Sequence, residues 1–103
     1  MTNVPSIAAK GEADAIEAEE WVVENPEAWD YMVRVAKRLS GTGYISVRYL
    51  LNIVRNELHI SVKNGLSPSF ARMMVAQHPE FAECIRRHES QCDAYFRGLY
   101  GAD

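Results

Sequence analysis

The feature that most constrains the fold is a series of amphipathic helical segments. In residues 47–58 and 26–39, apolar side chains recur at the spacing of a single helix face. They are Val47, Leu50, Leu51, Val54 and Leu58 in one segment, and Trp29, Met32, Val33, Ala36 and Leu39 in the other. Such spacing gives a helix an apolar stripe that must be buried against another element. The chain is therefore predicted to fold by packing helices together.

Residues with strong boundary preferences separate these segments. Asn25–Pro26 and Ser67–Pro68 each combine a residue that can cap a helix with a proline suited to the first helical position. Gly43 is expected to follow the end of one helix, Ser46 to cap the next, and Pro79 to start the last. Residues 12–24, rich in Ala and Glu, are expected to form the first helix.

The predicted fold is a compact all-α bundle of four to five helices in one domain, residues 12–103, after a flexible tail, residues 1–11. The helices beginning near Ser46 and Ser67 are expected to form a helix-turn-helix-like pair. Between them, Leu58–Lys63 alternates apolar and polar residues, which suggests one short extended segment with Ile60 and Val62 turned inward.

Several functional classes are disfavoured. The chain has two cysteines, and neither a signal-like start nor an apolar run near the ~20 residues of a membrane span. A cytoplasmic protein without a membrane partner is expected. Because no catalytic motif is present, we expect no enzyme, no catalytic residue and no cofactor. Cys84, His88 and Cys92 follow one another at helical spacing but extend too far along a helix to hold one ion, so no metal site is predicted.

Charge is sorted along the chain: the net charge is −7 over residues 1–30, +6 over residues 31–79 and −2 over residues 80–103. A basic centre favours a polyanion or an acidic protein surface as partner. For DNA or RNA, arginines and lysines would contact phosphates or guanine, and a glutamine could pair with adenine. The candidate nucleic-acid-binding residues are Arg48, Arg55, Lys63, Arg72 and Gln77. The alternative is that these cations are ordinary solvated side chains of amphipathic helices.

The C-terminal segment carries a second candidate surface. From Phe81 to Leu99, one residue of each turn continues a seam with the spacing found where two helices pack side by side. The partner could be another helix of this chain or a second copy, which would make a homodimer. The candidate interface residues are Phe81, Ile85, Tyr95, Phe96 and Leu99. With the acidic first helix, they would suit an alternative role in binding a protein.

From Asn25 onward, a sparse string of residues also resembles a known group. It reads Asn25–Pro26, Ala36, Gly43, Ser46, Leu50, Val54–Arg55, Asn64, Ala71–Arg72, Pro79–Glu80–Phe81 and Arg86. On these residues the chain resembles small, mostly uncharacterised helical accessory proteins encoded by phages and prophages. The resemblance implies a protein acting in the cytoplasm of a bacterial host and transfers no catalytic residue. The expected function is a phage-type regulatory protein that binds nucleic acid through a basic helical face. The alternative is an interaction module that inhibits or redirects a host factor in host takeover or anti-defence.

Overall fold

The computed structural model describes residues 7–89 of the 103-residue chain. The helices are α1 (Ile7–Glu24), α2 (Pro26–Ser40), α3 (Val47–Leu58) and α4 (Ser67–Gln77). Two 3₁₀ turns, η1 (Asn64–Leu66) and η2 (Pro79–Phe81), precede α4 and a further helical segment at residues 82–89. Within the described residues there is no strand. The prediction of an all-α bundle of four to five helices is confirmed.

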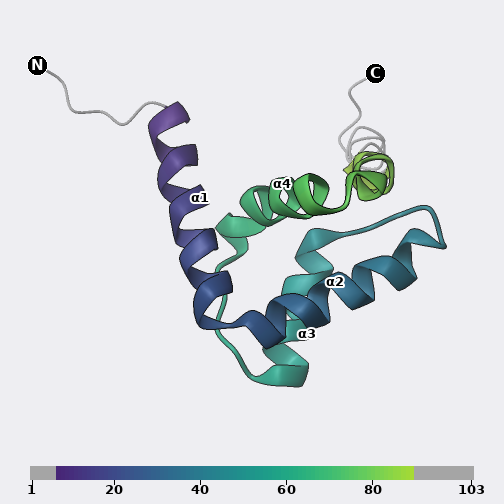
Figure 1. The fold of residues 1–103 in the computed structure, drawn as a ribbon, viewed down its shortest axis with the longest axis horizontal. Coiled ribbons are helices and arrows are strands. Elements are labelled where there is room, and N and C mark those ends of the chain that lie inside the picture. The colour runs from purple at the N-terminus through teal and green to yellow at the C-terminus, as the bar shows by residue number, and fades with distance from the viewer. Residues whose placement is uncertain (1–6, 90–103) are drawn as a thin grey trace, which may run out of the picture.

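The helices surround one apolar core (Figure 1). α2 and α3 pack against each other, α4 packs against α3, and α1 lies across the ends of α2 and α4, with η1 also against it. The end of α4 leads through η2 into helix 82–89, which lies at the far side of the molecule from α1. The core therefore draws on every described helix, and the outward faces of the helices point in different directions.

α1 begins at Ile7, earlier than the start near residue 12 that the sequence suggested. Its inward face follows the prediction: Ala18 is fully buried, and Trp21 and Val22 are half-buried. Ile16 and Val23, on the opposite face, remain 51% and 79% exposed. An alanine- and glutamate-rich sequence explains the helix, but only one stripe of it contributes to the core.

The junction between α1 and α2 corrects one expectation. Pro26 occupies the first turn of α2 as predicted, but the side chain of Asn25 makes no capping bond to that helix. Its Nδ2 instead donates to the Trp21 carbonyl oxygen at 3.0 Å, and its backbone N–H donates to the same oxygen at 2.8 Å. Asn25 therefore satisfies a free carbonyl at the end of α1.

α2 and α3 form the centre of the core as the periodicity predicted. Trp29, Met32, Val33 and Ala36 are buried from α2, and Val47, Leu50, Leu51 and Val54 from α3. The turn between the helices contains Gly43 at φ +90°, a conformation that side chains other than glycine adopt only with strain. Ser46 caps α3, because its Oγ accepts the Tyr49 N–H at 3.2 Å. This part of the fold was predictable from local signals.

The connection from α3 to α4 is irregular. His59 ends α3 in the left-handed conformation at φ 57°, and Val62 is then buried while Ile60 is half-buried. Ser67 does not cap α4, since its Oγ donates back to the Asn64 carbonyl oxygen at 2.8 Å. α3 and α4 are consecutive packed helices, but residues 59–66 between them exceed the turn of about three or four residues found in DNA-reading helix-turn-helix motifs.

The far end of the core corrects the assignment of Phe81 and Ile85 to an interface. Phe81 is 1% exposed and Ile85 is 8% exposed, both inside the core of their own chain. Their seam therefore packs within the molecule, and neither side chain is available to a second copy. Tyr95, Phe96 and Leu99 lie outside the described residues, so a homodimer through them stays a prediction.

Candidate nucleic-acid interface

Arg55, predicted to bind phosphate, is occupied by bonds within the chain. Its Nε and Nη2 donate to the Val62 carbonyl oxygen at 2.9 and 2.6 Å. The guanidinium also donates to Asn52 Oδ1 and Asn64 Oδ1, both at 2.8 Å. The planar fork of a guanidinium suits such a set of acceptors. Arg55 thus holds residues 62–64 against α3, so these bonds give it a structural role.

Lys63 is paired with the acidic first helix. Its Nζ lies 2.8 Å from Glu17 Oε2 of α1, at the surface. The hydrogen bond to Glu17 and the attraction between the two charges raise the pKa of Lys63 above its ordinary value. Nearby, Trp21 Nε1 donates to the Ser61 carbonyl oxygen at 2.9 Å and holds α1 against the same connection. A phosphate could bind Lys63 only in competition with Glu17.

Of the other three predicted residues, two lie on α4 and one lies on α3. Gln77 accepts a hydrogen bond from Trp29 Nε1 at 3.3 Å, which ties the end of α4 to α2. Arg72 is exposed on the α4 face opposite Phe70, with Nη2 at 3.5 Å from Ser69 Oγ. Arg48 is exposed on the first turn of α3. Of the five predicted residues, Arg55, Lys63 and Gln77 are therefore bonded to other parts of the chain, while Arg48 and Arg72 are exposed on two different helices.

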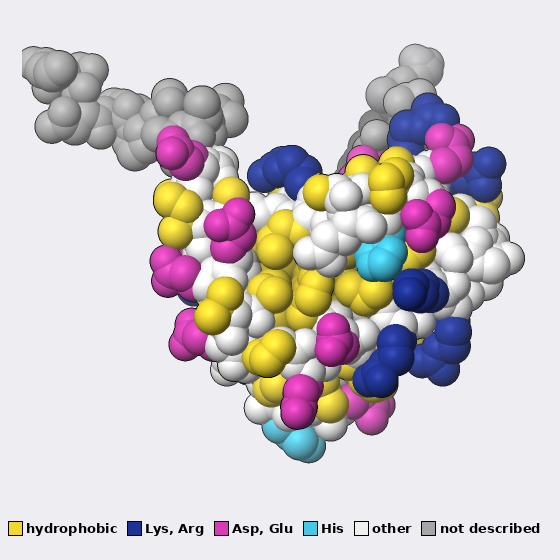
Figure 2. Space-filling view, viewed as in Figure 1, with side chains coloured by type: hydrophobic (Ala, Val, Ile, Leu, Met, Phe, Trp, Pro, Cys, Tyr) yellow, Lys and Arg dark blue, Asp and Glu magenta, His cyan; other side chains and the backbone are white. Residues whose placement is uncertain are grey.

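A different group of cations does share one side of the molecule. Figure 2 shows acidic side chains along α1 at the left and most of the visible Lys and Arg side chains at the right, over α2 and helix 82–89, with acidic side chains among them. The exposed cations of these two elements are Arg34, Lys37, Arg38, Arg86 and Arg87, and we call them the basic surface. The three from α2 make no ion pair with any carboxylate in the described part of the chain. Their charges are therefore available to a ligand.

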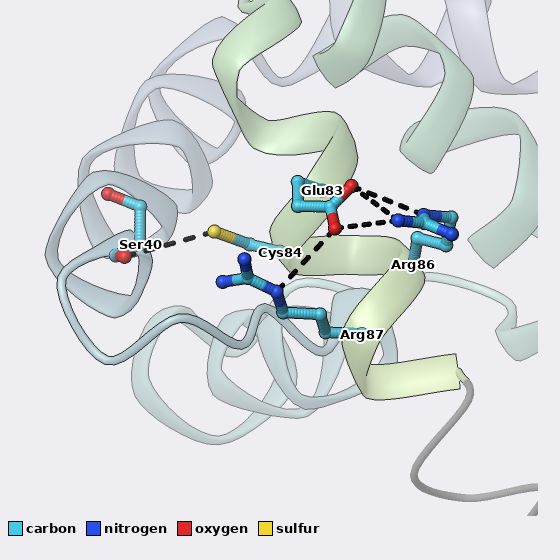
Figure 3. Close-up of polar contacts among 5 residues, drawn as sticks. All are labelled: Ser40, Glu83, Cys84, Arg86 and Arg87. Atoms are coloured by element: carbon cyan, nitrogen blue, oxygen red, sulfur yellow. Dashed lines mark hydrogen bonds and ion pairs between the residues drawn. The ribbon is translucent and has the colours of Figure 1, made fainter.

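Packing at the end of α2 brings the two parts of the basic surface together. The Ile45 N–H donates to the Cys84 carbonyl oxygen at 3.2 Å, and Cys84 Sγ lies 3.8 Å from the Ser40 carbonyl oxygen (Figure 3). Cys84 is buried and packs as a small apolar residue. These contacts hold helix 82–89 beside the C-terminal turn of α2.

Acidic side chains lie among these cations (Figure 2), and one of them, Glu83, is paired with both arginines of helix 82–89. Glu83 receives Arg86 Nη2 at 2.6 and 2.8 Å, and its Oε1 lies 3.6 Å from Arg87 Nε (Figure 3). The hydrogen bonds from Arg86 lower the pKa of Glu83. Glu83 thus offsets part of the charge of the two arginines, whereas no carboxylate among residues 7–89 is paired with the cations of α2.

The sequence held a partial signal for this surface. Arg34, Lys37 and Arg38 have the spacing of one polar helix face, away from the apolar stripe of α2. Arg86 and Arg87 fall in the C-terminal part of the chain, whose net charge is negative, so a charge count along the sequence passes over them. Only the contact between helix 82–89 and α2 places the two groups together.

Comparison with protein-family models, with curated proteins and with solved structures finds no match for this chain. None of the described helices is both long enough and apolar enough to cross a bilayer. Across residues 7–89, no three His, Cys, Asp or Glu side chains gather where they could hold a metal ion. Cys92, which follows Cys84 and His88 at helical spacing, lies outside the described residues.

Proposed function

We propose that this chain is a small phage-type accessory protein that binds nucleic acid through the basic surface. The observation that supports the proposal most directly is that Arg34, Lys37 and Arg38 have no carboxylate partner among residues 7–89. Each phosphate that a cation neutralises releases counterions, so a group of free cations on one side is what sequence-independent binding to a polyanion requires.

The overall distribution of charge supports the same orientation. The acids of α1 lie on the opposite side from the basic surface, so the molecule is electrostatically polar even though its formal net charge is −3. A polyanion would be repelled from α1 and drawn to the far end of α2 and helix 82–89. The function proposed here is the one expected from the sequence, but the residues proposed to bind the nucleic acid are different.

Fluorescence anisotropy with labelled DNA and RNA across a salt series tests this proposal. The double variant Lys37→Ala/Arg38→Ala should bind more weakly, and the slope of log affinity against log salt should fall by about one for each phosphate that is no longer neutralised. The matched control is Arg72→Ala, which removes an exposed arginine on α4 and should leave the slope unchanged. Absence of binding at low salt would refute the function. Weaker binding by the Arg72 variant alone would place the site on α4 instead.

A second candidate, a protein-interaction module acting on a host factor, is supported by the outer face of α1. Ile16 and Val23 are exposed there beside Glu19, Glu20 and Glu24, which line a shallow hollow with them. None of the three glutamates has an ion pair with another described residue. By charge complementarity, the partner that fits is a helical segment of a host protein with Lys or Arg flanking apolar residues.

A lysine-rich amphipathic model peptide provides the test of this second function. It should bind the parent protein, and Ile16→Ser/Val23→Ser should abolish most of the binding, because the apolar side chains are removed while every charge is kept. The matched control is the double variant Lys37→Ala/Arg38→Ala, which should bind the peptide normally. Equal binding by the parent and the Ile16/Val23 variant would rule out the face.

A further inference from the structure

We propose that the ligand of the basic surface is single-stranded nucleic acid and that Tyr44 stacks on one of its bases. This inference rests on the proposed nucleic-acid function and specifies its substrate. It starts from the segment between α2 and α3, residues 41–46. Ile45 in that segment is fully buried, and its N–H is bonded to Cys84, whereas Tyr44 is left 44% exposed. A large aromatic ring is therefore presented to solvent from a segment that is fastened to the core.

The backbone around Tyr44 is fixed by short-range bonds. Thr42 Oγ1 donates to the Leu39 carbonyl oxygen at 2.7 Å, and the same hydroxyl oxygen accepts the Tyr44 backbone N–H at 3.4 Å. The turn is also anchored to the end of α2, because the backbone N–H of Thr42 donates to the Leu39 carbonyl oxygen at 2.9 Å. Because the backbone of this turn is already ordered, less conformational entropy is lost when a base stacks on the ring.

Cations of the basic surface border this turn. Lys37 and Arg38 occupy the last turn of α2, just before it. On the other side, a Cβ placed on Gly43 would lie only 3.5 Å from Arg87 Nη1, so this guanidinium is next to the residue that precedes Tyr44. The first turn of α3 then adds the exposed Arg48 and the half-exposed ring of Tyr49. Residues 37–49 thus carry three exposed cations, Lys37, Arg38 and Arg48, and two half-exposed tyrosine rings.

This combination favours a single strand over a duplex. In a duplex, both faces of each base are covered by its neighbours, so an exposed tyrosine can gain no stacking contact unless the helix is disrupted. In a single strand, the faces are free, and a groove of cations with aromatic rings can bind the backbone and the bases together. Removing one stacking ring typically weakens such binding by about 5- to 150-fold.

The test compares labelled oligothymidylate and oligouridylate of about 12 nucleotides with a duplex of equal length, a size within the range of small single-strand sites. The parent protein should bind a single strand more tightly than the duplex, and the two single strands show whether DNA or RNA is preferred. Tyr44→Ala should weaken single-strand binding at least about 5-fold with an unchanged salt slope, because no charge is removed. Tyr44→Phe should retain the affinity, since the ring is kept.

Ile16→Ala is the matched control, because it trims an exposed apolar side chain on α1, away from the basic surface. It should bind like the parent protein, and circular dichroism should show that all variants remain helical. Equal or tighter binding to the duplex, full affinity in Tyr44→Ala, or a loss in Tyr44→Phe as large as in Tyr44→Ala would each overturn the stacking inference while leaving nucleic-acid binding intact. Failure to bind any of the three ligands would remove the proposed function as well.

Discussion

Replacing Arg55 with Ala should destabilise the fold without changing how affinity for nucleic acid depends on salt. The main consequence is at the Val62 carbonyl oxygen, which loses the donors Nε and Nη2 next to a side chain that is only 9% exposed. Losing the hydrogen bonds from a charged donor to this part-buried oxygen costs about 1–3 kcal/mol. Asn52 and Asn64 are exposed and can bond to water, so they add little. We expect the free energy of unfolding to fall by about 1–3 kcal/mol.

Urea denaturation followed by circular dichroism measures this change, and in a domain of this size each kcal/mol lowers the midpoint temperature by about 4–8 °C. Arg55→Lys is the informative companion. It keeps the charge but lacks the planar fork, so it should recover less than half of the stability. A stability change below about 0.5 kcal/mol in Arg55→Ala would refute the structural role, because that is the range of an ordinary surface substitution. A drop in the salt slope of Arg55→Ala that is reversed in Arg55→Lys would also refute the structural role, because a phosphate contact needs only the charge.

Three further predictions concern the apolar core, the turn between α2 and α3, and the ion pair between Glu83 and Arg86. Phe70→Ala should lower the free energy of unfolding by about 3–5 kcal/mol in urea denaturation, because the fully buried ring packs against two tryptophans at centroid distances of 5.3 and 5.8 Å. Gly43→Ala should cost about 1–2 kcal/mol through strain at positive φ, whereas Gly41→Ala, at φ −65°, should be tolerated; equal midpoint temperatures for the two variants would contradict this. The stabilisation from Glu83 should be complete above its ordinary pKa of 4.5 and should disappear as the pH falls through the lowered folded-state value; Glu83→Gln should remove this part of the pH dependence of thermal stability, and an identical profile would argue against the ion pair.

The sequence predicted the helices best where one periodic stripe and one boundary residue agreed. α2 and α3 follow their apolar spacing, and Ser46 caps α3 as expected, because each of these features depends on residues within a turn or two. Asn25 and Ser67 were assigned wrongly for a related reason. Both have short polar side chains that can bond to either neighbouring segment, and in each case a preceding carbonyl is the partner.

For the candidate site, the sequence indicated a basic character but not its location. It could not show that Arg55 would bond to the Val62 carbonyl oxygen, because the fold of residues 59–66 brings that oxygen within reach. Nor could it show that Lys63 would pair with Glu17, because that contact depends on the packing of α1. Nor could it show that Phe81 packs within its own chain, since the same seam would serve a second copy equally well.

The sequence by itself determined the helical class, the main helix boundaries and the apolar faces of α2 and α3, because these follow from contacts between residues a few positions apart. The tertiary structure decided which charges remain free, which are used internally, and that Tyr44 is exposed on a turn that Arg87 approaches. Those properties depend on residues such as Gly43 and Arg87, far apart in the chain and adjacent only after helix 82–89 has packed against the end of α2.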